Sequence, residues 1–388
     1  MDLSRLVAGL SIFAVVGLAN WFAVASRHSE ARRTAAHSSP RRSIASGRRR
    51  LSLNAEGIAD ASSFKPERTV AYLDARAEKW RSEHGCVSCH SAQPYLLAQS
   101  ALNPGAPSAT AIQYRQLIVD RLSQGDAATP WYDSSSEKTA ESRSIESVMN
   151  ASSLVAFDAS KRSPSLTPET RQALDRMMTL QEADGSWLPL NFSLPPWEAR
   201  ESRLWTTATA AIALGSAADQ YSASPATDPG AQKVRAYLKS ASRDPGLNLH
   251  DRLMLLWAEA RLGSILDSSI KQSYIDAVLD TQADQGGFDL DRFGNWKKLG
   301  ASVADKSDGY ATGLAVLVLR QSGLRADHPK IRKATNWLLL HQGETGDWPG
   351  TTLDSSIESD DEAVFNNGLV RDAGAAYALM ALDSVGSL

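Results

Sequence analysis

Both cysteines of this 388-residue chain lie in one short stretch, Cys86-Val87-Ser88-Cys89-His90. Two thiols separated by two residues and followed directly by histidine form the C-x-x-C-H pattern of c-type haem attachment. Each thiol can add to one vinyl group of the porphyrin, and the adjacent imidazole can bind the iron as proximal ligand. The stretch therefore predicts one covalent haem c, bound through Cys86, Cys89 and His90, with His90 as the metal ligand.

Three other interpretations of the stretch stay open. Chance is the first, because the pattern is short. A redox disulfide is the second, although that motif usually opens a helix after a strand in a βαβ unit, and the surrounding sequence has no such pattern. A structural zinc site is the third. Such a site needs four ligands, and this turn supplies three.

Apolar residues recur at steps of three and four from residue 66 onward, which is the period of amphipathic helices. The pattern predicts six pairs of helices. The outer members are expected at 66–83, 110–124, 167–182, 228–242, 267–283 and 328–342. The inner members are expected at 93–102, 143–159, 201–218, 248–263, 308–323 and 369–385. Pro66, Pro168 and Pro329 lie near outer starts, where proline is tolerated.

Three joins between outer and inner helices share one motif: a glutamine, a short polar gap, a glycine and an aromatic residue. They span 180–187, 281–288 and 341–348. In this motif the chain resembles the QW-type repeats of the squalene-hopene cyclase and prenyltransferase superfamily, well over 165–388 and more loosely over 66–160. The resemblance implies an all-α fold, an α/α toroid of about six helix pairs whose inner helices line a cavity. It also implies that Trp187, Phe288 and Trp348 are packing residues.

The chemistry of that superfamily does not transfer as readily as its fold. Its cyclases protonate an alkene with a D-x-D-D acid, which needs neighbouring carboxylates to stay protonated. Acids occur at 289–292, 305–308 and 358–362, but none of these stretches keeps that order. The prenyltransferases need a zinc-bound thiolate, and both cysteines belong to the haem motif. If the protein is an enzyme, the sequence favours a haem-dependent oxidoreductase over a terpene cyclase.

The C-x-x-C-H stretch lies at the first join between an outer and an inner helix, so we expect the haem at one rim of the toroid. Polar groups that begin the other inner helices should lie on the same rim: Arg203, Trp205, His250, Asp251, Arg252, Asp308, Tyr310, Arg371 and Asp372. Either these groups hold the haem propionates or a small substrate, or they are helix caps and ion pairs. Met149 and His250 are the candidates for a sixth iron ligand, and a vacant sixth position is the alternative.

The first 62 residues differ from the rest in composition. Residues 1–25 are predicted to be a signal peptide or membrane anchor, because 6–25 are uncharged and apolar and end in an A-x-A pattern. Residues 26–62, rich in serine and arginine, are predicted to be a disordered linker, and 63–388 the toroid domain. Eight arginines in 27–50 oppose simple export, whereas the haem motif favours it. We expect a periplasmic or otherwise exported protein, membrane-tethered if residues 6–25 stay attached.

Residues 51–388 contain 32 basic and 42 acidic side chains, a formal charge of about −10, which argues against a nucleic-acid partner. The main functional prediction is an exported c-type haem protein that performs electron transfer or redox chemistry with a redox partner protein. One alternative is a terpene cyclase- or prenyltransferase-like enzyme with an apolar, isoprenoid-like molecule in the toroid cavity. The other is a non-catalytic binding scaffold.

Overall fold

The computed structural model describes residues 64–103, 105–161, 165–221, 228–294, 296, 307–354, 357 and 359–388. Within these residues the fold is all-α, with fourteen α-helices, two short 3-10 helices and no β-strand beyond two isolated bridges. The predicted leader at 1–25 and linker at 26–62 lie outside the described residues. Among the helices that are described, none is both long and apolar enough to cross a bilayer.

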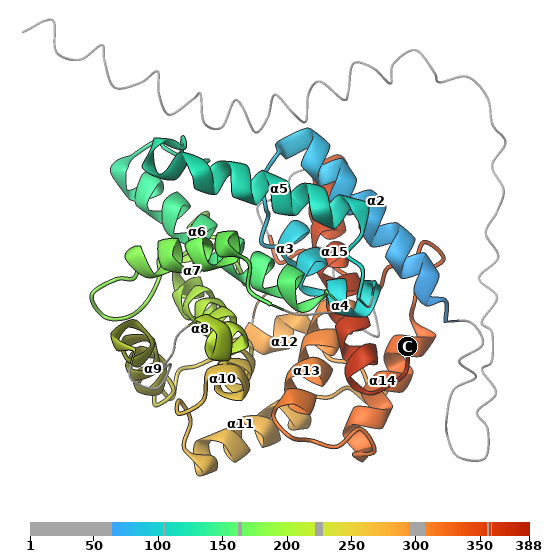
Figure 1. Cartoon of the computed structure of the whole chain (residues 1–388). Coiled ribbons are helices and arrows are strands. Elements are labelled where there is room, and N and C mark those ends of the chain that lie inside the picture. Colours follow the sequence, from blue (N-terminus) through green and yellow to red (C-terminus); the bar gives the residue numbers. More distant parts are fainter. Residues whose placement is uncertain are drawn as a thin grey trace, which may run out of the picture.

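Six pairs of outer and inner helices follow one another along the chain, as the sequence predicts (Figure 1). The outer helices are α2 (Pro66–His84), α5 (Ala109–Gln124), α7 (Pro168–Thr179), α9 (Pro229–Ala241), α11 (Ser268–Asp280) and α14 (Pro329–Leu340). The inner ones are α3 (Ala92–Leu97) with its continuation α4 (Gln99–Leu102), α6 (Ser136–Ala159), α8 (Arg203–Tyr221), α10 (Leu249–Leu262), α13 (Gly309–Gln321) and α15 (Asp360–Ser384). A short helix α12 (Leu290–Gly294) lies between α11 and α13.

The inner helices form a closed ring. Each packs against the next in the order α3, α6, α8, α10, α13 and α15, and α15 packs back against α3. The outer helix α2 also packs against α15, so the two ends of the described chain lie side by side (Figure 1). This arrangement is the predicted α/α toroid.

Burial explains why the helices sort into two layers. Outer helix α2 buries only Thr69, Leu73 and Ala77, a single stripe that faces the ring. Inner helix α13 buries every residue from Gly309 to Leu319, because it is covered by neighbours on all sides. Two inner helices start earlier than their apolar pattern: Ser135 and Ser359 cap α6 and α15, and their side chains accept hydrogen bonds from backbone N–H groups.

The glutamine of each repeat motif joins its own turn to the next outer helix. Gln181 Nε2 donates to the carbonyls of Gly185 and Gly230, each at 3.1 Å. Gln282 does the same with Gly286 and Lys330, each at 2.8 Å. In the last repeat, Gln342 Nε2 donates to Lys65 O at 2.9 Å and to Thr69 Oγ1 at 2.7 Å, which connects the end of α14 to the start of α2. The predicted packing role of Trp187, Phe288 and Trp348 is confirmed, because all three are at most 1 % exposed.

Replacing Gly346 by alanine is expected to lower the free energy of unfolding by about 2–4 kcal/mol. Gly346 has φ +97°, and an added Cβ would lie 2.3 Å from the carbonyl oxygen of Arg68, at the contact that closes the ring. Gly323 is the matched control, since it has φ +108° and open space around the Cβ position. Replacing Gly323 by alanine should lower the free energy of unfolding by only about 1–2 kcal/mol, the cost of holding alanine at a positive φ. Equal losses for the two variants in urea titrations would contradict this account.

Candidate functional site

The C-x-x-C-H stretch forms a tight connection between α2 and α3, which we call the cysteine turn (residues 85–91). Gly85 ends α2 with φ +65°, in the left-handed conformation that glycine adopts readily. Ser88, inside the motif, then shapes the turn: its hydroxyl accepts hydrogen bonds from the N–H groups of Ser91 and Ala92, both at 3.1 Å. The two thiols and the imidazole therefore come from one short segment that is fixed at both ends.

Asp372, a predicted rim residue on α15, anchors the cysteine turn. It is 1 % exposed and accepts a hydrogen bond from Ser91 Oγ at 2.7 Å. It also accepts from Tyr72 Oη at 2.8 Å and from Arg76 Nε and Nη2 at 2.7 and 2.9 Å. This ion pair, in which Asp372 is buried and Arg76 is partly exposed, joins α2, α15 and the residue directly after His90, and so positions the motif.

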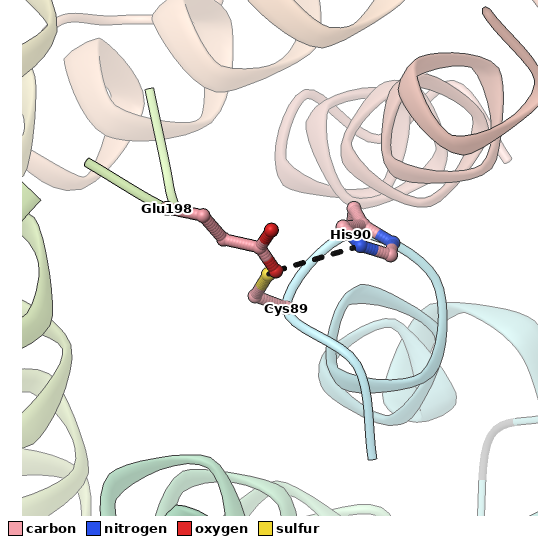
Figure 2. Close-up of side chains that lie close together, drawn as sticks. All are labelled: Cys89, His90 and Glu198. Carbon is pink, nitrogen blue, oxygen red and sulfur yellow. Dashed lines mark hydrogen bonds and ion pairs between the residues drawn. The ribbon is translucent and has the colours of Figure 1, made fainter. Parts of the chain in front are cut away.

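Glu198, which the sequence did not identify, lies against the cysteine turn. Cys89 Sγ donates a hydrogen bond to its Oε1 at 3.1 Å, and His90 Nε2 lies 3.8 Å from the same oxygen (Figure 2). Glu198 belongs to the segment between Trp187 and α8. The segment is fixed by backbone hydrogen bonds between Glu198 and Leu194 at 2.8 and 2.9 Å. The three side chains point toward one another from parts of the chain 109 residues apart.

Burial sets the protonation of these groups. It lowers the pKa of His90 to about 3, so the imidazole is neutral at physiological pH and its contact with Glu198 is not an ion pair. It raises the pKa of Cys86 to about 11. The pKa of Cys89 is also raised well above its usual value, by burial first and then by the nearby carboxylate of Glu198. Burial also raises the pKa of Glu198. His90 Nδ1 is buried and has no hydrogen-bond partner among the described residues.

Lowering the pH from 7 to 5 is expected to destabilise the haem-free protein through His90. In the unfolded chain a histidine protonates near pH 6.5, whereas the folded chain keeps His90 neutral down to about pH 3. The folded state is therefore penalised as the pH falls below about 6.5, by about 2 kcal/mol at pH 5. Urea titrations of wild type and His90→Gln at both pH values measure this. The same pH dependence in both proteins would be the contradicting result.

Two pairs of aromatic side chains lie at or next to the cysteine turn, and we call these four residues the aromatic collar: Trp80 with Phe365, and Tyr132 with Phe192. The Trp80 ring contacts His90 edge-on at 5.3 Å and Phe365 at 6.5 Å. Tyr132 contacts Phe192 at 4.9 Å, and Glu198 and the two cysteines lie close enough to raise the pKa of its hydroxyl, after the larger effect of burial. Three of the four are 38–40 % exposed. Exposed aromatic surface of this kind often marks a binding site.

Most of the other predicted rim residues have structural partners. Asp308 caps α13: its side chain accepts from Ala311 N at 2.7 Å and from Leu290 N at 2.9 Å. Arg371 pairs with Asp347 at 3.2 Å, and Arg203 lies 3.8 Å from Asp184. Trp205 is buried in the core, burial raises the pKa of Asp251 to about 7, and the Arg252 guanidinium stacks over the Tyr274 ring at 5.3 Å. These contacts favour the helix-cap and ion-pair interpretation of the rim.

The two candidates for a sixth iron ligand lie in different surroundings. Met149 is 2 % exposed in the apolar core on α6. His250 is 1 % exposed, and its Nε2 shares a hydrogen bond of 2.9 Å with Tyr310 Oη. Tyr310 in turn accepts from Trp197 Nε1 at 3.2 Å, and the Trp197 ring lies 6.1 Å from His90. Both assignments stay predictions.

No protein-family model and no curated protein sequence matches this chain. Solved structures do. The type II terpene cyclase MstE from Scytonema is 14% identical, with a TM-score of 0.48 over 82% of this chain and 99% of its own. The ent-copalyl diphosphate synthase from Streptomyces platensis is 15% identical, with a TM-score of 0.48 over 82% of this chain and 51% of its own. A glycosidase is 15% identical, with a TM-score of 0.49 over 87% of this chain and all of its own. Structural similarity at 14–15% sequence identity does not show that two proteins share a reaction or a substrate.

Proposed function

We propose that the chain is an exported c-type haem protein in which Cys86 and Cys89 hold the haem and His90 binds its iron. The cysteine turn is the main support, because it presents the only two thiols of the chain and a neutral imidazole from one short, anchored segment. A bound haem would supply a one-electron redox centre. The proposal includes a leader or tether at residues 6–25 and a redox partner protein.

The residues fit this group in their chemistry, with one condition. Burial keeps both thiols protonated and the imidazole neutral, and the aromatic collar offers apolar surface of the kind a porphyrin needs. The condition concerns His90 Nε2, which faces Glu198 at 3.8 Å. For that nitrogen to bind iron, the Glu198 segment must first release this contact.

A haemochrome spectrum tests the proposal. The full chain would be produced with a c-haem maturation system in an export-competent host, purified, and reduced in alkaline pyridine. The position of the α-band then reports the number of thioether bonds, because each bond removes one vinyl group from conjugation with the porphyrin. We expect two thioethers and one haem per chain. A colourless protein in which both thiols react with an alkylating reagent would contradict the proposal.

A second candidate function is a scaffold for an apolar ligand, consistent with the terpene cyclase-like toroid. Buried aromatic side chains of several inner helices support it. The Tyr310 ring contacts Trp197 and Tyr377, each at 5.0 Å, and Tyr377 contacts Trp257 at 6.0 Å. A bound apolar molecule in native mass spectra of the haem-free chain would favour this function. Mass spectra of the bare chain alone would count against it.

A further inference from the structure

Three different metal-ligating atoms converge beside the cysteine turn: a sulfur, an imidazole nitrogen and a carboxylate oxygen. Cys89 Sγ, His90 Nε2 and an oxygen of Glu198 all lie within 4.8 Å of one another (Figure 2). The sulfur and nitrogen come from adjacent residues, whereas the oxygen comes from the segment before α8. The sequence alone shows only the donors within the turn. The fold brings Glu198 to them as a donor from outside it.

The spacing of these atoms is close to that of ligands around one tetrahedral ion. With metal–ligand bonds of about 2.0–2.3 Å, neighbouring donors in a tetrahedral zinc site lie about 3.3–3.6 Å apart. The observed separations from Glu198 Oε1 are 3.1 Å to Cys89 Sγ and 3.8 Å to His90 Nε2. Both separations are within about 0.5 Å of these values, so small side-chain shifts would bring the carboxylate oxygen to bonding distance of an ion shared with the sulfur and the nitrogen.

The charges of the site also favour a cation. A Cys89 thiolate and a Glu198 carboxylate would together carry two negative charges, which a divalent ion neutralises. The arginines on either side of the turn are already paired: Arg76 with Asp372 at 2.7 Å, and Arg121 with Glu146. Cys89 is 7 % exposed, and the side chains of His90 and Glu198 are 12 and 21 % exposed, so water screens these donors only weakly.

We propose that Cys89, His90 and Glu198 bind one divalent transition-metal ion when no haem is attached. The mixed sulfur, nitrogen and oxygen set suits zinc, cobalt or ferrous iron better than magnesium or calcium. Three protein ligands leave a fourth position for water, the arrangement of open zinc sites. On binding, the Cys89 S–H bond breaks, a sulfur–metal bond forms and the proton passes to solvent. The ion and the haem need the same two residues, so they are alternative occupants.

Cobalt binding tests this inference directly. The full chain, produced without haem maturation factors and kept reduced, would be titrated with Co²⁺ while the thiolate-to-cobalt and d–d absorption bands are recorded. We expect one cobalt per chain with a single thiolate ligand, displaced by Zn²⁺. Cys89→Ser should lose the thiolate band. Glu198→Gln should weaken binding at least about 100-fold, since even residues that only support a metal ligand contribute 10–100-fold.

Two further variants make the result specific. Glu201→Gln removes an exposed carboxylate three residues from Glu198 and should bind cobalt like the wild type. Cys86→Ser removes a haem thiol but no donor of the metal site, so its cobalt spectrum should also match the wild type. Absence of the thiolate band in the wild-type protein, or identical titrations of wild type and Glu198→Gln, would overturn the inference. Circular dichroism would confirm that each variant is folded.

The inference does not depend on the haem proposal, and the two can fail separately. A cobalt spectrum with one thiolate in a chain that never acquires covalent haem would refute only the haem proposal. Covalent haem in a chain whose haem-free form gives no thiolate–cobalt band would refute only the metal site.

Discussion

Replacing Cys86 and Cys89 together by serine is expected to abolish covalent haem completely. No other thiol exists in the chain, so no thioether bond can form. Each single replacement should leave haem attached through one thioether bond. One vinyl group then stays unreacted, so the α-band should shift from its position in the wild type toward that of haem with free vinyl groups. Co-expression with the maturation system, followed by a haem stain of a denaturing gel, measures the loss.

The single variants are the controls for folding in this series. Serine is close to cysteine in size, and Cys86 lies outside the core, so Cys86→Ser should keep the helical circular dichroism and the melting temperature of the haem-free wild type. A double variant that retains stainable haem would show that the pigment is held by something other than the cysteine turn.

Replacing Asp372 by alanine is expected to cost about 3–5 kcal/mol of unfolding free energy, because it removes the buried carboxylate that pairs with Arg76 and accepts two further hydrogen bonds. The change leaves Arg76 without its carboxylate and takes away the acceptor of Tyr72 and Ser91. Since Ser91 directly follows the haem motif, the yield of covalent haem should fall as well. Urea titration of the haem-free form measures the first effect, and a haem stain at matched protein load the second.

Asp372→Asn is the matched variant for this prediction. It keeps the shape and one carbonyl acceptor but removes the charge, so its loss of stability should lie between those of wild type and Asp372→Ala. A stability of Asp372→Ala within about 1 kcal/mol of the wild type would mean that the pair is no stronger than an exposed one, and that another contact fixes the turn.

The helix ring could be predicted from the sequence because its signals are local. Apolar residues at helical spacing, prolines at helix starts and the glutamine-glycine-aromatic joins each act within a few residues. The same close contact recurs at each join. A Cβ added to Gly185, Gly286 or Gly346 would lie within 2.4 Å of a backbone carbonyl oxygen of an outer helix. Local patterns of this kind determine fold class without knowledge of long-range contacts.

Glu198 could not be predicted because its role depends on a contact across 109 residues. It follows Pro195, Pro196 and Trp197 in a segment without helical or strand period, and single acids in such segments are usually solvated. The one available signal was length, since the chain takes far more residues from Trp187 to α8 than a simple turn needs. Asp372 was identified as a rim residue, but only the fold shows that its partners are Arg76 and Ser91.

The central claim is that iron porphyrin is bonded to the sulfurs of the cysteine turn, and the intact mass of the denatured protein tests it most directly. The chain, matured in an export-competent host and unfolded in acid and organic solvent, should keep the added mass of one haem. In a tryptic digest this mass should lie on the peptide that contains Cys86 and Cys89. The bare mass of the chain, with the pigment released into the solvent, would contradict the account.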